Sequence, residues 1–109
     1  MKHPEPFRPE ERAEYSDDKM AKTTLYRSAQ MLVGLNAFEP GQEHALHAHA
    51  GMDKVYYVLA GRGEFLLEDG PRPLTAGDML IAPADVPHGI RNSGTERLLV
   101  LALLAPSPG

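Results

Sequence analysis

Apolar and polar residues alternate in short runs from Thr23 onward, and most runs end at a glycine, proline or acidic turn. Short runs with turn signals about every 8 to 12 residues are typical of antiparallel β-structure. The pattern predicts strands at Thr24–Tyr26, Gln30–Phe38, Glu43–His49, Lys54–Ala60, Glu64–Glu68, Met79–Ala82, His88–Asn92 and Leu98–Ala105. No helix is predicted after residue 22, so we expect an all-β domain folded as a sandwich or closed barrel.

Two of the expected strands are apolar at consecutive positions rather than at alternate ones. They are the segments Val55–Leu59 and Leu98–Leu104. Such strands are covered on both faces. One face would fill the interior of the domain, and the other would meet the N-terminal segment or a second subunit. We therefore expect a homodimer.

The first 22 residues form a polar arm of different character. Pro4, Pro6 and Pro9 disfavour helix at its start, although Glu10–Tyr15 fits a single helical turn. The arm lacks the apolar stretch of a signal peptide. The expected organisation is an arm over residues 1–22, a barrel over residues 23–106 and a loose tail over residues 107–109.

Composition narrows the classes of function. A chain of 109 residues suits one domain, and its 42% apolar and 24% charged residues are ordinary for a soluble protein. The net charge of −4 does not favour nucleic acid or an anionic membrane surface as a partner. No run approaches the roughly 20 apolar residues of a membrane span. The absence of cysteine removes thiolate and disulfide chemistry and favours a cytoplasmic location.

Histidines give the strongest indication of chemistry. His47 and His49 are two residues apart on an expected strand, so their imidazoles share one face. His88 lies far downstream, and folding could bring it to the pair to form a site for a divalent metal. His44 is at odd spacing from His47 and is expected to face away. His3 lies in the arm and is taken as incidental.

The histidines lie within two motifs that resemble those of the cupin family, which are small jelly-roll barrels. The first motif, G-x5-H-x-H-x3/4-E-x6-G, is matched at Gly41, His47, His49 and Gly61. The second, G-x5-P-x-G-x2-H-x3-N, is matched at Gly77, Pro83, His88 and Asn92, with Asp85 in the glycine slot. The resemblance implies one jelly-roll β-barrel and one divalent transition metal, Fe, Mn, Ni or Zn, held by His47, His49 and His88.

The chain departs from the family pattern at the glutamate ligand, where it has Lys54. The neighbouring Asp53 would face the opposite way. An ammonium about 4 Å from a cation is repelled by about 4 kcal/mol at an effective dielectric of about 20. Three arrangements would relieve this: Lys54 turns to Glu43 or Glu64, which we favour, or loses its proton to act as a base or weak ligand, or the site holds no metal. The parity of Glu43 fits either the pocket or a solvated strand end.

Two classes of function follow from the resemblance. The first is a metal-dependent enzyme on a small, anionic molecule, with a mononuclear dioxygenase favoured over an isomerase or lyase. Its candidate catalytic residues are Lys54, as the anchor of the substrate, and Tyr56, which shares the parity of Lys54. Core packing is the simpler explanation of Tyr56. The alternative is a non-catalytic module that binds a sugar or another small molecule, without metal because Lys54 replaces the glutamate.

Overall fold

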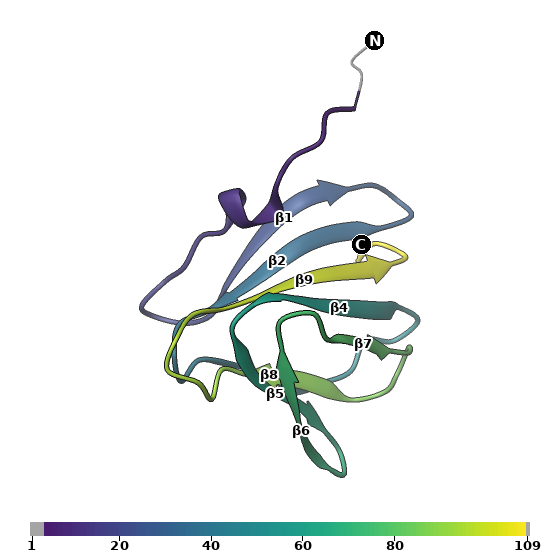
Figure 1. Cartoon of the computed structure of the whole chain (residues 1–109). Helices are drawn as coiled ribbons and strands as arrows, with labels where there is room; N and C mark the ends of the chain where they lie inside the picture. Colours follow the sequence, from purple (N-terminus) through teal and green to yellow (C-terminus); the bar gives the residue numbers. More distant parts are fainter. Residues whose placement is uncertain (1–3, 109) are drawn as a thin grey trace.

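The computed structural model describes residues 4–108, so His3 lies outside the described residues. The described chain forms a short 3₁₀ turn and nine strands (Figure 1). Their bounds are η1 (Pro9–Arg12), β1 (Ala21–Arg27), β2 (Leu32–Phe38), β3 (Glu43–His47), β4 (Asp53–Ala60), β5 (Arg62–Leu67), β6 (Gly70–Thr75), β7 (Met79–Ala82), β8 (His88–Arg91) and β9 (Leu98–Ala105). No helix within residues 4–108 is long and apolar enough to cross a membrane.

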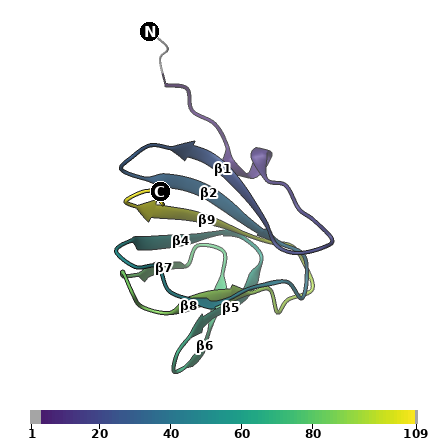
Figure 2. The same cartoon turned by 180° about the vertical axis from the view of Figure 1, so that it is seen from behind.

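The strands form two antiparallel sheets, which Figure 2 shows from the opposite side. One sheet has the order β1-β2-β9-β4-β7, and the other has the order β3-β8-β5-β6. Strands distant in sequence are therefore neighbours, as β2 and β9 are. The expected all-β jelly roll is confirmed, in the form of two sheets rather than one continuous barrel of hydrogen bonds among the described residues.

The main core lies between the two sheets. Its buried members are Phe38, Tyr56, Val58, Phe65, Leu74, Ile90, Leu98, Val100 and Ala102. They come from strands of both sheets, at positions that alternate with outward-facing ones. Burial of this apolar surface, worth about 25 cal/mol per Å², holds the sheets together and fixes the strands that carry the histidines.

A second apolar cluster lies on the outer face of the five-stranded sheet. Leu35, Ala37 and Leu99 are buried there, and Ala13 and Tyr15 of the arm pack against them. The arm thus covers part of the face that the consecutive apolar residues of β9 present. This confirms that the strand is covered on both faces. Residues 4–8, which precede the turn η1, extend away from the sheets (Figure 1).

The strand β6 was not predicted, because Asp69-Gly70-Pro71 at its start was interpreted as a turn. Proline cannot donate a ladder hydrogen bond and is tolerated in a sheet only where that donor is not needed. The strand β6 lies at the edge of its sheet and pairs only with β5 in the described chain. Pro71 and Pro73 therefore fit the strand without breaking an inner ladder.

Asn92, directly after β8, ties three segments together. Its side-chain amide donates to the carbonyl of Phe38 at 3.0 Å and to that of Glu96 at 2.8 Å, and its Oδ1 accepts from the amide of Gly94 at 3.0 Å. The side chain is fully buried. It bonds local backbone and also reaches across to β2.

We expect Asn92→Leu to lower the free energy of unfolding by about 2–4 kcal/mol, because it leaves the buried carbonyl of Phe38 without its partner and removes the part-buried bonds to Glu96 and Gly94. Urea unfolding followed by circular dichroism measures the change. Ser93→Ala at the exposed neighbouring position is the control and should change stability by less than about 0.5 kcal/mol. Equal stability of Asn92→Leu and the parent chain would contradict this role.

Candidate metal centre

Three histidines meet at the interior side of the pair β3 and β8. His47 is the register partner of His88, and His49 follows the end of β3 by two residues. The ring centroids lie 4.4 Å apart for His47 and His88 and 4.8 Å apart for His47 and His49. One nitrogen from each ring lies within 4.8 Å of the other two. The structure thus brings the three predicted ligands together from two distant segments.

Hydrogen bonds on the far side of two rings fix which nitrogen carries the proton. The Nδ1 of His47 lies 2.7 Å from the carbonyl oxygen of Ala45, and the Nδ1 of His88 lies 2.9 Å from that of Val86. A carbonyl can only accept, so each Nδ1 donates and each Nε2 keeps a free lone pair. The Nε2 atoms of His47, His49 and His88 are buried and have no partner among the described residues. This is the arrangement of metal-binding imidazoles.

The electrostatics of the site keep these rings neutral. Burial lowers the pKa of all three, and the nearby Lys54 lowers each further. The backbone bonds to Ala45 and Val86 act in the opposite direction on His47 and His88, with a smaller effect than burial. Neutral imidazole is the form that binds a metal, so the residues present fit a divalent ion.

His44 does not face away, contrary to expectation. Its ring stacks on that of His47 with centroids 4.1 Å apart. The register of β3 on β8 shifts between these two residues, and such an irregularity reverses the usual alternation. His44 therefore pairs with the buried Ile90 and points inward. Its pKa falls to about 3, mainly through burial.

Lys54 lies in the interior rather than beside a carboxylate. Its side chain is only 3% exposed, and no acidic group of the described residues forms an ion pair with it. Its Nζ lies 4.7 Å from the centre of the Tyr56 ring. Burial, followed by the charge of Lys22, lowers the pKa of Lys54 to about 8. The expectation that Lys54 turns to Glu43 or Glu64 was wrong. The lysine is instead a buried cation at neutral pH.

Comparison with known proteins agrees with this geometry. The family model for the Cupin domain matches residues 34–104, which include all three histidines and Lys54. The chain is a cupin. It is therefore one of the small jelly-roll domains that its two motifs resemble, and the expectation drawn from the sequence is confirmed.

Individual relatives of this cupin share its fold and part of its sequence. SchB of Streptomyces halstedii is 40% identical over 79 residues, which cover 70% of this chain and 57% of SchB. The oxalate-binding protein of Thermotoga maritima is 29% identical over 85 residues, 78% of this chain and 69% of that protein. The solved structure of TT1209 from Thermus thermophilus superposes with a TM-score of 0.86 at 39% identity, covering 91% of this chain and 94% of that one.

The loop before β8 shows how this cupin accommodates its departure at Asp85. Asp85 has a φ of 69°, the left-handed region that favours glycine and that aspartate tolerates better than most residues. Its amide donates to the carbonyl of His49 at 3.0 Å. The loop that delivers His88 is thereby tied to the segment that carries His49. Asp85 thus adopts, in the glycine slot of the motif, a backbone conformation that favours glycine.

The two acidic residues nearest the site in sequence both lie outside it. Asp53 is exposed, and its Oδ1 accepts a hydrogen bond from the amide of Ala84 at 2.9 Å. Glu43 is also exposed and lies 3.8 Å from Arg91, with which it pairs across the sheet. Of the two positions considered for Glu43, the solvated strand end is correct. The register shift in β3 places Glu43 and His47 on opposite faces, although their spacing along the chain is even.

Tyr56 is buried beside the centre. Its side chain has no exposed surface, and its ring centroid lies 5.7 Å from that of His88. The hydroxyl has no hydrogen-bond partner among the described residues, and burial raises its pKa. Tyr56 also belongs to the main core, so it packs there as well as lying close to the histidines.

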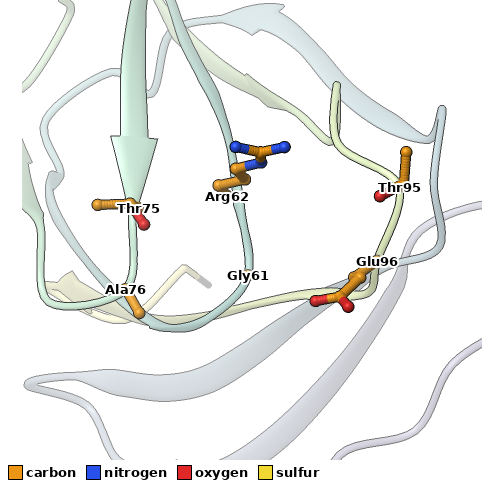
Figure 3. A pocket seen from close by; sticks show the side chains of 6 residues that line it. All are labelled: Gly61, Arg62, Thr75, Ala76, Thr95 and Glu96. Atoms are coloured by element: carbon orange, nitrogen blue, oxygen red, sulfur yellow. The ribbon is translucent and has the colours of Figure 1, made fainter.

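Another hollow, of about 450 Å³, lies where β4 turns into β5, at the opposite end of β4 from Lys54 (Figure 3). Arg62 and Thr75 enter it from paired strands, and Thr95 and Glu96 enter it from the loop before β9. All four side chains are exposed, and no histidine lines the hollow. This hollow is therefore separate from the group of three histidines.

Proposed function

We propose that this cupin is a metal-dependent enzyme that binds one divalent ion at His47, His49 and His88 and acts on a small anionic molecule. The observation that carries the proposal is the set of three buried, unpartnered Nε2 atoms within reach of one ion. Three neutral imidazoles leave coordination positions for a ligand, as in catalytic rather than structural sites. A mononuclear dioxygenase is favoured over an isomerase or lyase.

The bound ion would supply Lewis acidity and, as iron or manganese, redox chemistry. The rest of the work falls to the side chains around it. Lys54 would hold the anionic group of the substrate, since it is a buried cation without a carboxylate partner in the described chain. Tyr56 would donate a hydrogen bond, since its raised pKa keeps the hydroxyl protonated. The name of the Thermotoga relative, an oxalate-binding protein, supports a carboxylate ligand.

The proposal is tested by metal analysis of protein purified without a histidine tag and then loaded with iron, manganese, nickel or zinc. We expect about one equivalent of metal per chain. Less than about a tenth of an equivalent after loading would reject the metal centre. Oxygen uptake by the iron-loaded protein with a panel of small carboxylates, diols and thiols then tests the dioxygenase assignment.

A second candidate, a non-catalytic module that binds a small molecule, is favoured by the same buried Lys54. A cation in the place of the family's glutamate weakens the hold on a metal and leaves a site suited to an anion alone. Tight ligand binding without metal and without turnover across the panel would select this candidate. The cytoplasmic location and the division into arm, barrel and tail stay predictions.

We also propose that the chain forms a homodimer through the outer face of its five-stranded sheet. On β4 and β7, Tyr57 is 36% exposed, Met79 57% and Ile81 62%. The outward positions of β4, β7 and β9 carry no charged side chain except Asp53, which lies at the first position of β4. A second copy of the same face can cover the apolar residues of this surface, with Asp53 left at the rim of the two-fold interface.

We expect Ile81→Asp to weaken this dimer by at least about 100-fold, because it places a carboxylate in the buried centre of the interface. Light scattering after size-exclusion chromatography measures the mass. Val86→Asp, at an exposed apolar residue of the loop before β8, is the control and should leave the mass unchanged. A monomeric parent chain would overturn the dimer, and an unchanged Ile81→Asp dimer would overturn the choice of face.

A further inference from the structure

A cavity of about 270 Å³ opens between β1, β2, β4 and β9 and reaches the histidine centre, since His49 forms part of its wall. Within residues 4–108, three charged side chains line it, those of Lys22, Arg27 and Lys54. The only described histidine in its lining is the candidate metal ligand His49. No carboxylate lines it among the described residues, although the whole chain has a net charge of −4. The cavity is therefore a positively charged pocket in an acidic protein, which favours an anionic ligand.

Two largely buried residues of this cavity, Lys54 and Asn36, carry donors that the described chain leaves without a carboxylate or an amide partner, respectively. Lys54 is 3% exposed and has no carboxylate partner in the described chain. Asn36 is 4% exposed, and its Nδ2 has no hydrogen-bond partner there. A buried donor without an acceptor is a free-energy cost, and native interiors rarely keep one without a use. Both residues lie on the inner side of the sheet and line the same cavity.

We propose that Lys54 and Asn36 form a carboxylate subsite, so that the ligand of this cupin is a short dicarboxylate with one end at the histidines and the other at this pair. The assignment of the first end depends on the proposed function. The second end accepts a charge-assisted hydrogen bond from Lys54 and a neutral one from the Asn36 amide. Lys22 and Arg27 are exposed and attract the anion at the opening.

Charge and size select this class of ligand. The largely buried Lys54 supplies one positive charge, which matches the single negative charge of a carboxylate, whereas a phosphate dianion would leave a charge uncompensated in the interior. At about 30 Å³ for each water-sized group, a cavity of about 270 Å³ holds roughly nine such groups. Malonate and succinate fit within that limit.

Isothermal titration of the manganese-loaded chain with succinate tests the subsite, with butyrate and succinamide as the singly charged and neutral analogues. We expect succinate to bind at least 10-fold more tightly than either analogue. Lys54→Met should lower the affinity for succinate by at least 10-fold, and Asn36→Leu should lower it by about 3- to 10-fold. Arg62→Met, at an exposed arginine at the far end of β4, is the matched control and should leave affinity unchanged.

The outcomes separate this inference from the proposed function, because metal content is measured in each variant. If metal binds and succinate affinity is the same in Lys54→Met and the parent chain, the subsite is wrong and the metal centre stands. If phosphate binds more tightly than succinate, the carboxylate class is wrong.

If the parent chain binds no metal, the proposed function fails. Butyrate binding to the metal-free chain then decides the subsite: dependence on Lys54 upholds it, and independence overturns it. Asn36→Leu gives an independent result if Lys54→Met does not fold.

Discussion

Replacing His88 with alanine will lower the affinity of the chain for a divalent metal by at least about 100-fold. His88 supplies one of the three free Nε2 lone pairs, and two imidazoles alone hold a divalent ion far less tightly. Loss of a partner that only orients a ligand already lowers metal affinity by about 10- to 100-fold, so loss of the ligand itself should exceed that range. Competition between the protein and a chelating dye for zinc measures the change.

His44→Gln is the matched control for the loss of a ligand. His44 is a half-buried imidazole stacked on His47, yet it lies outside the group of three nitrogens that can surround one ion. We expect it to change metal affinity by less than about 10-fold. A similar loss in both variants would show that disturbed packing rather than lost ligation explains His88→Ala. Thermal unfolding of both metal-free variants separates misfolding from loss of ligation.

The sequence predicts those features of the fold that depend on local patterns. The strands β7 and β9 have the bounds expected from their apolar runs and flanking turns. The three candidate ligands were found from the spacing of His47 and His49 and from the position of His88 in a second motif, which resembles that of the cupin family. Short-range periodicity and turn chemistry decide such features, so no knowledge of strand pairing is needed.

Features that depend on pairing between distant strands were not predicted. The inward position of His44 results from the shift in register between β3 and β8, which alternation along one strand cannot reveal. One signal was present, namely Gly89. A Cβ at Gly89 would lie 2.6 Å from the carbonyl oxygen of His44, so the close approach of the two strands requires glycine there. The environment of Lys54 could not be predicted either. Its candidate partners, Glu43 and Glu64, lie beside Arg91 instead, and this arrangement depends on how the strands pair.

The substitution Lys54→Glu will tighten divalent metal binding by about 100-fold or more. It removes a buried cation that lowers the pKa of His47, His49 and His88, and it places an anionic oxygen donor where the family has its glutamate. A single ammonium about 4 Å from a unit charge contributes about 4 kcal/mol at an effective dielectric of about 20. A 100-fold gain requires about 2.8 kcal/mol, so it falls well within that limit. Zinc and manganese titrations against a competing chelator measure the gain.

Lys54→Met separates the two contributions, because it removes the charge without adding a ligand. We expect it to gain about 10-fold, with the remaining gain of Lys54→Glu due to the new carboxylate. The metal-free Lys54→Glu chain should be less stable, since a buried carboxylate without a partner is costly, and metal should restore its thermal midpoint. If Lys54→Glu binds metal no more tightly than Lys54→Met, then position 54 does not reach the ion. The inward-pointing lysine would then act on the ligand alone.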